Sequence, residues 1–421
     1  MNNTISSARV RTVSERLWSG FGWLIGILFA TILVLDKAVY NILALIAVGI
    51  AFIAIYSYRP RLDTELKMLG LVLIANLLLA LPNIILARDG LISLENPVRM
   101  LLMIPLVLAV MRYGLRARFI CVGLSVGMLA AALVVSWQYH VMEVIRPGIN
   151  YNTILFSEVA MSAFAVLLAA CLVIRDRLVP LYLAGLLAAL YCVILSGTRG
   201  TLVAIIPLMI FLLWWGWRRD VWRVKSFSRW MILFPVILLF LGTVLISTGH
   251  FIDRVQLAGK QTRDYFERND ASTPIGQRLE LWKGTLLVAR EHPMLGIGEH
   301  KAFLKNKVAN GELQPIVAIM RYAHNDYLGT LQSRGVPGLL LQLLIYILPL
   351  LIFLRGLAKS NERQRFAALG GVLMTIEYAT YSLTEMPMHN GLPLVFYIVS
   401  TGLLIGIIKH LQSPNSADYS C

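Results

Sequence analysis

Long apolar segments recur along this chain of 421 residues, and they constrain its fold more than any other feature. About 20 consecutive apolar residues in helical form cross a bilayer, and a helix satisfies its own backbone hydrogen bonds in lipid. Hydrophobic residues make up 58% of the chain and charged residues only 14%, whereas soluble domains contain about 25% charged residues. We therefore expect an all-α, polytopic integral membrane protein.

The apolar segments predict about twelve transmembrane helices. One long hydrophilic segment separates the ninth helix from the tenth, so three regions are expected: 1–249 with helices 1–9, a loop over 250–335 with amphipathic helices and the active-site residues, and 336–421 with helices 10–12 and a short tail. The predicted spans lie near 18–35, 39–57, 68–87, 99–111, 119–136, 154–174, 178–196, 201–217, 230–249, 336–354, 366–384 and 391–408.

Positive charge is distributed unevenly between the two predicted sides of the membrane. Twenty-one of the 38 Lys and Arg residues fall in segments on one side, and five fall in the short loops of the other side. Cytoplasmic loops are the ones enriched in Lys and Arg, so we place both termini in the cytoplasm and the 250–335 loop outside it. The net charge of +15 thus reflects orientation, and we expect no nucleic-acid partner because no basic soluble module is present.

The sequence holds no motif for a metal or a cofactor. Three of the four cysteines lie inside apolar segments, which argues against a disulfide framework or a cysteine-based metal site. No Walker sequence is present, and the histidines and carboxylates near the loop lack the helical spacing of a metal motif. We therefore expect neither metal nor cofactor. These histidines and carboxylates are His292, Glu299, His300, Glu385 and His389.

The short outer loops hold few cations, so each cation there is a candidate for ligand binding. Ser196-Gly197-Thr198-Arg199-Gly200 links the seventh and eighth predicted helices, and its two glycines allow the backbone to approach a ligand closely. Arg199 is the only charge in that loop. It either extends to lipid headgroups or binds an anionic ligand, and its place on the side poor in cations favours the second interpretation.

Arg278 is the second candidate cation, near the start of an amphipathic helix predicted from about Gln277 to Glu291. His292-Pro293 ends this helix, because the residue before a proline disfavours helical geometry. The helix dipole favours anions at an N-terminus, so a cation there makes more sense if an anionic ligand also binds at that end. The alternative is a solvated helix face.

His324 lies just before the tenth predicted helix, beside Asn325 and Asp326. Histidine ordinarily titrates near neutrality, and a neighbouring amide or carboxylate can hold it in one tautomer. A lone histidine is more often structural, but polar neighbours at the membrane interface make His324 a candidate general base. Asn325 and Asp326 either orient it or cap the turn. Glu299 and Glu385 are the next candidates for the base.

Taken in order, these segments resemble the O-antigen ligase family. The resemblance covers most of the chain in topology and mainly residues 190–400 in sequence. The matching elements are the Ser196–Gly200 turn, Gly276-Gln277-Arg278-Leu279 with Trp282, His292-Pro293 with Gly296-Ile297-Gly298, and His324-Asn325 with Leu328 and Gly335-Val336-Pro337-Gly338.

The resemblance implies a function and a place for it. Members of this family act at the periplasmic face of the bacterial inner membrane and move a glycan from undecaprenyl diphosphate to an acceptor. For the ligase itself the acceptor is a sugar hydroxyl of the lipid A–core oligosaccharide, which completes lipopolysaccharide. By motif position, Arg199 and Arg278 would bind the diphosphate and His324 would be the catalytic base of a metal-independent, inverting transfer. Guanidinium groups suit phosphate oxygens, and a sugar hydroxyl needs a general base.

Other functions remain open from the sequence. O-antigen polymerases and protein O-oligosaccharyltransferases of the same superfamily carry overlapping motifs, although the latter usually have extra extramembrane sequence for a protein acceptor. A transporter or flippase for the lipid carrier would show paired broken helices in repeated halves, and the sequence contains no such repeat.

The topology can be tested with reporter fusions. A periplasm-specific reporter fused after Ala271 is expected to be active, because the predicted loop lies outside, and a cytoplasm-specific reporter fused after Arg223 is expected to be active inside. The reversed result at either position would contradict the assigned orientation.

Overall fold

The computed structural model describes residues 18, 20–56, 60, 62–86, 91–218, 256–298, 301–320, 323–358 and 361–412. Within these residues the chain is helical and has no strand, so the all-α expectation is confirmed. Nine of the described helices are long and apolar enough to cross a membrane. The span predicted near 230–249 lies outside the described residues, and the number twelve stays a prediction.

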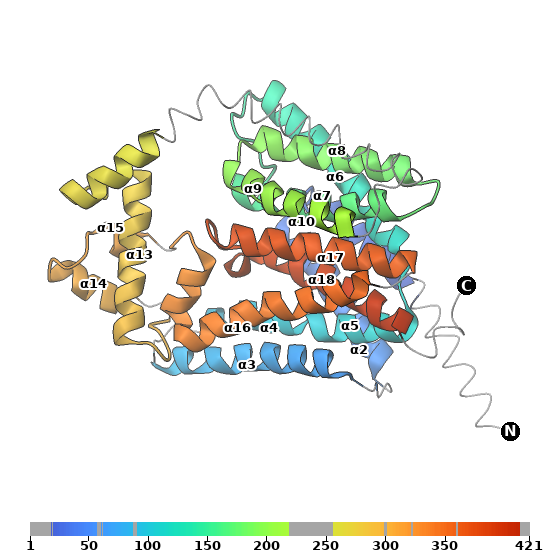
Figure 1. Ribbon diagram of the computed structural model, residues 1–421, viewed down its shortest axis with the longest axis horizontal. Helices are drawn as coiled ribbons and strands as arrows, with labels where there is room; N and C mark the ends of the chain where they lie inside the picture. Colours follow the sequence, from blue (N-terminus) through green and yellow to red (C-terminus); the bar gives the residue numbers. More distant parts are fainter. Residues whose placement is uncertain are drawn as a thin grey trace.

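The apolar helices lie side by side and form one bundle (Figure 1). A shorter apolar helix over Gly20–Thr31 lies ahead of them in the chain. In order, the bundle contains α2 (Lys37–Ile55), α3 (Thr64–Leu86), η1 (Leu91–Leu94), α4 (Glu95–Leu101), α5 (Met103–Tyr113), α6 (Ala117–His140), α7 (Thr153–Val173), α8 (Val179–Ser196), α9 (Arg199–Val203), α10 (Ile205–Arg218), α16 (Asp326–Leu357), α17 (Glu362–Tyr381), η2 (Pro387–His389) and α18 (Gly391–Gln412).

Several predicted spans are interrupted or altered in the structure. The fourth consists of α4 and α5, which are separated at Leu102, and the eighth consists of α9 and α10, which are separated at Ala204. The eleventh, α17, is 20 residues long but is not among the nine apolar helices, because its first turns carry polar and charged residues. It nevertheless packs against α7, α16 and α18.

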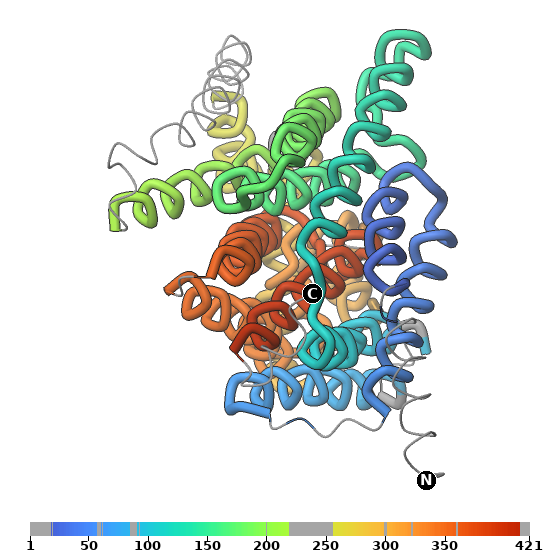
Figure 2. The backbone as a smooth tube through the Cα atoms, turned by 90° about the vertical axis from the view of Figure 1, so that its right-hand side faces the viewer, coloured from blue at the N-terminus to red at the C-terminus, as the bar shows by residue number. Residues whose placement is uncertain are grey.

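Two helices form the centre of the bundle. In the apolar stretches of α7 and α18, 89% and 94% of the residues are buried inside the bundle. A helix that is hydrophobic on every face is typical of such a central position. Viewed from one end, α18 lies between α3 and the layer that contains α8 and α10 (Figure 2).

Small residues permit the closest helix contacts. A methyl group added at Gly185 of α8 would lie 2.5 Å from the Cα atom of Ser125 in α6, so the two backbones approach directly. A methyl group at Gly123 of α6 would likewise overlap the backbone of Gly26. Small residues at helix interfaces are a general feature of packing in membranes.

A separate group of short helices covers one end of the bundle. This loop module comprises the helical residues 256–268, α13 (Pro274–Glu291), α14 (Ala302–Ala309) and α15 (Ile316–Ile319), and α13 runs across the ends of the bundle helices (Figure 1). Its own apolar core is small. That core contains Leu281, Val288, Leu304, Leu313 and Val317.

α13 begins three residues before its predicted start. Thr273 caps the helix by accepting the amide hydrogen of Gly276 on Oγ1 at 3.1 Å, and Pro274 occupies the first helical turn, where its missing amide hydrogen costs nothing. The helix ends at Glu291, before His292, as predicted.

α16 is kinked where the loop module meets the bundle. Gly335 has φ 65° and ψ −166°, which opens the helix, and the amide of Val336 donates to the carbonyl of Pro293 at 2.7 Å. On the other side of the kink, the amides of Ile297 and Gly298 donate to the carbonyls of Gln332 and Ser333. The loop boundary predicted at 335 therefore falls on the kink, and α16 already begins at Asp326.

Gly335→Ala is expected to destabilise the protein by about 2–4 kcal/mol, because the new methyl group would be strained at positive φ and would overlap Pro293. Unfolding can be followed with a thiol-reactive dye, since Cys121, Cys171 and Cys192 are buried and free. Gly259→Ala is the matched control, because nothing lies within 4 Å of its added methyl group. Equal melting temperatures for the two variants would contradict the role of the kink.

Candidate functional site

His324 lies just before α16, in a segment that is anchored on both sides. Trp282 of α13 donates from Nε1 to the carbonyl of Ala323 at 3.0 Å. On the other side, Asn325 donates from Nδ2 to the carbonyl of Leu383 at 3.0 Å. Asn325 also caps α16 through its side-chain oxygen. These bonds fix the backbone around the histidine from both the loop module and the bundle.

His324 itself has an unusual backbone conformation. Its φ is +49°, a left-handed geometry that costs a non-glycine residue about 1–3 kcal/mol and that concentrates at functional sites. Its side chain is 32% exposed. The surrounding bonds thus hold a strained residue whose imidazole remains accessible to a ligand.

One carboxylate links His324 to Arg278. Glu385 Oε2 lies 3.4 Å from Nδ1 of His324, and its Oε1 lies 3.6 Å from Nη2 of Arg278. The three side chains come from three elements: α13, the segment before α16, and the turn after α17. We call these residues the Arg278–Glu385–His324 cluster. Glu385 was a secondary candidate from the sequence, and the structure places it between two primary ones.

The cluster is loosely bonded and open to solvent. Both separations exceed the 2.7–3.2 Å of an ideal hydrogen bond, and the Arg278 side chain is 42% exposed. A guanidinium carries five N–H donors, so one contact with Glu385 leaves donors that can bind an anion. Chemically, the cluster combines an anion-binding cation with a histidine that can accept a proton.

The turn that contains Arg199 lies beside this cluster. α9 starts at Arg199, and the Cβ position of Gly200 is 3.6 Å from Oγ1 of Thr384, the residue before Glu385. Gly197 ends α8 in a left-handed conformation with φ 64°. Only the backbone of Arg199 is described, so the direction of its side chain stays a prediction.

The turn also has a cation that the sequence analysis did not assign to the site. Arg146 donates from Nε to the carbonyl of Ser196 at 3.3 Å. Arg146 is one of the five cations predicted in the short outer loops. The scarcity of cations there, which makes Arg199 a candidate for ligand binding, applies equally to Arg146.

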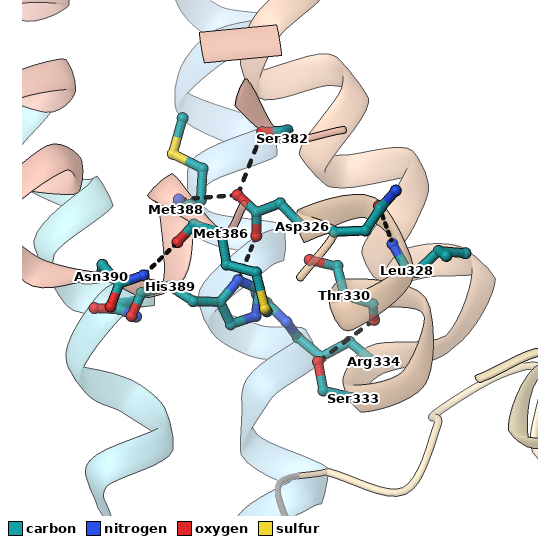
Figure 3. A network of polar contacts seen from close by, with 12 residues as sticks. Asp326, Leu328, Thr330, Ser333, Arg334, Ser382, Met386, Met388, His389 and Asn390 are labelled. Atoms are coloured by element: carbon teal, nitrogen blue, oxygen red, sulfur yellow. Dashed lines mark hydrogen bonds and ion pairs between the residues drawn. The ribbon is translucent and has the colours of Figure 1, made fainter. Parts of the chain in front are cut away.

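The carboxylate of Asp326 is directed toward His389 (Figure 3). This carboxylate is fully buried and pairs with Nδ1 of His389, whose side chain is 11% exposed. The same carboxylate accepts the amide hydrogen of Met388 at 2.9 Å and the hydroxyl of Ser382 at 3.4 Å. No local pattern in the sequence indicates this pairing, because the two partners are 63 positions apart.

A cavity of about 760 Å³ lies on the His389 side of these segments. It is lined by residues from α2, α3, α4, α7, α16 and α18 and by parts of the loop module. The cluster residues do not line it. Glu299 lies outside the described residues. Within the described part of the chain, no group of three or more His, Cys, Asp and Glu side chains could hold a metal ion.

A buried carboxylate holds α13 in place. Glu280 is fully buried; its Oε2 accepts from the hydroxyl of Tyr265 at 2.6 Å and its Oε1 accepts from the amide of Gln314 at 2.9 Å. Burial and the bond to Glu280 raise the pKa of Tyr265 above its ordinary value. Glu280 thus connects α13 to the segments of Tyr265 and Gln314. It lies two residues after Arg278 in the same helix.

Comparison with known proteins connects these segments to one family. Residues 184–343 match the family model described as O-antigen ligase, a range that contains Arg199, Arg278 and His324. A protein of Haemophilus influenzae, described as uncharacterised, is 22% identical over 386 residues, which cover 89% of this chain and 94% of that protein. The family match confirms the resemblance found in the sequence.

Glu280→Ala is expected to destabilise the loop module by about 1–3 kcal/mol for each buried partner left without a hydrogen bond, and to increase proteolysis between 256 and 320. Lys305→Ala is the control. Its side chain is exposed on α14, so its loss is expected to change the free energy of unfolding by less than about 0.5 kcal/mol. Similar protease sensitivity of the two variants would contradict the role assigned to Glu280.

Proposed function

Because residues 184–343 match the model of the O-antigen ligase family, we propose that this membrane protein is an O-antigen ligase. In this proposal it transfers O-antigen polysaccharide from undecaprenyl diphosphate to a sugar hydroxyl of the lipid A–core oligosaccharide. The reaction takes place at the periplasmic face of the bacterial inner membrane, where both lipid-anchored substrates can reach the loop module sideways from the bilayer.

The observation that supports this proposal best is the Arg278–Glu385–His324 cluster. Arg278 and His324 are 46 positions apart in the sequence, yet both contact the same carboxylate. The α9 turn lies beside Thr384, the residue before Glu385. An anion-binding group and a proton acceptor thus lie next to each other, as transfer from a diphosphate donor to a hydroxyl acceptor requires.

Arg278 and Arg199 are assigned to the donor. As the bond between the anomeric carbon and the phosphate oxygen breaks, the leaving undecaprenyl diphosphate keeps the electron pair, and negative charge grows on its oxygens. Guanidinium donors stabilise that charge, and they bind two phosphate oxygens at once more readily than a lysine ammonium does.

His324 is assigned to the acceptor. The acceptor oxygen forms the new bond to the anomeric carbon while its proton moves to the imidazole of His324. Direct attack from the face opposite the leaving diphosphate inverts the anomeric configuration. Because Glu385 lies beside Nδ1, the other ring nitrogen, Nε2, is the one that would accept the proton. Glu385 is then a positioning residue that stabilises the imidazolium formed.

Reconstitution with both substrates tests the base. His324→Ala is expected to lose about two to four orders of magnitude in turnover while still binding the undecaprenyl-linked donor, since the arginines hold the diphosphate. His140→Ala, at the exposed end of α6, is the matched control and should keep wild-type turnover. Near wild-type turnover of His324→Ala would overturn the assignment of His324.

The same assay separates guanidinium binding from charge alone. Arg278→Ala is expected to abolish most transfer, and Arg278→Lys is expected to restore only part of it.

Lipopolysaccharide profiles of a deletion strain then test the choice of acceptor. Accumulated lipid-linked polymer supports a ligase, whereas absence of the polymer itself would point to a polymerase.

A further inference from the structure

The cavity beside His389 is distinct from the Arg278–Glu385–His324 cluster. Its volume of about 760 Å³ is within the range of about 300–1,000 Å³ typical of small-molecule sites. It lies where the start of α2, the C-terminal end of α3 and the start of α18 meet the loop module. The proposed reaction, as described above, makes no use of it.

The charged residues that line this cavity are predominantly cationic. Among its described residues, four are Lys or Arg, namely Lys37, Arg99, Lys301 and Arg334, and one is a carboxylate, Glu95. Glu95 is already paired with Arg99 at 2.5 Å. An excess of cations around an enclosed volume favours an anionic ligand.

Neighbouring polar groups hold two of these cations, Arg334 and Arg99, in place. Arg334 donates from Nη1 to Oδ1 of Asn76 at 2.6 Å, and Arg99 donates from Nη1 to Oδ1 of Asn96 at 3.4 Å. Asn96 in turn donates to the carbonyl of His389 at 3.0 Å. Arg99 and His389 are therefore connected through Asn96.

His389 contributes a further polar atom to the lining. Buried Asp326 engages its Nδ1, so the ring orientation is fixed, and Nε2 has no hydrogen bond within the described part of the chain. With Nδ1–H directed to a carboxylate, Nε2 accepts a hydrogen bond in the neutral ring, for example from a protonated phosphate oxygen, and donates one in the protonated ring.

The same pair of segments contributes residues to the cluster and to the lining of the cavity. Asp326 is two residues after His324, and His389 is four residues after Glu385. The amide of Asp326 donates to the carbonyl of Ser382 at 2.8 Å, which joins the two segments directly. A saccharide that occupies the cavity can therefore extend toward the cluster.

We propose that this cavity binds a phosphate group on the acceptor saccharide, with Lys37, Arg99 and His389 as contacts. The inference rests on the proposed function, in which Arg199 and Arg278 take the diphosphate of the donor. The cavity would then serve the second substrate. A sugar phosphate carries between one and two negative charges at neutral pH, which matches the cationic lining.

Equilibrium binding of the acceptor glycolipid tests this proposal without requiring turnover. The probes are phosphorylated lipid A–core and the same glycolipid after phosphatase treatment, each titrated onto the full-length protein in neutral phosphatidylcholine nanodiscs. Wild-type protein is expected to bind the phosphorylated form at least about tenfold more tightly. Lys37→Gln/Arg99→Gln should raise the Kd of that form about tenfold or more and leave the Kd of the dephosphorylated form unchanged.

Two further variants keep the test specific. Lys305→Gln removes an exposed cation of α14 that does not line the cavity, so its binding should match the wild type. His389→Gln retains an N–H donor for Asp326 and should weaken binding of the phosphorylated form alone. Equal wild-type affinity for the two glycolipids, or equal weakening of both in the variants, would overturn the proposal.

The outcomes also distinguish this inference from the proposed function. Transfer activity with no preference for phosphate would overturn the cavity assignment and leave the ligase proposal standing. Selective phosphate binding without transfer would support the cavity and contradict the ligase. Replacing part of the phosphatidylcholine with phosphatidylglycerol separates a phospholipid headgroup as the source. Loss of acceptor selectivity in those nanodiscs would assign the cavity to phospholipid and overturn the proposal.

Discussion

The buried carboxylate of Asp326 is the interaction on which both candidate sites depend. It joins the start of α16 to the connection between α17 and α18 through His389, Met388 and Ser382. Removing one partner of a buried hydrogen bond typically costs about 1–3 kcal/mol, because the other polar group is left unsatisfied. This junction joins the segment that carries His324 to the segment that carries Glu385 and His389. Their relative geometry is therefore set by the fold and does not require a ligand.

The loop module adds Arg278 to this arrangement by means of polar contacts more than apolar burial. Its own core consists of five buried side chains, which is small for a segment that must hold a cation in position. Glu280 compensates, since its two oxygens bind groups from both neighbouring segments. Trp282 then connects α13 to the residue before His324. The candidate cation and the candidate base are thus coupled through one helix.

The sequence predicted the features that depend on local chemistry. Apolar length identified most helices, and Pro293 marked the end of α13. Motif order identified the segments of Arg278 and His324, and the predicted outer position of Glu385 kept it among the candidate bases. It did not predict contacts that depend on tertiary packing: the pairing of Asp326 with His389, the approach of Arg146 to the α9 turn, and the kink at Gly335. The α17 helix was found despite its polar first turns, because its remaining residues are apolar enough to indicate a span.

The kink at Gly335 has a mechanical consequence for the site. Its backbone bonds to Pro293, Ile297 and Gly298 attach the C-terminal end of α13 to the bundle, and Arg278 is 13 residues away from Glu291 on the same helix. At 1.5 Å per residue, that distance is about 20 Å. The contacts of Glu280 and Trp282 therefore matter for the position of Arg278, because without them a tilt of α13 by about 5° at this attachment would move Arg278 by about 1.7 Å. A displacement of that size would separate or tighten the contact with Glu385 while leaving the helix itself straight.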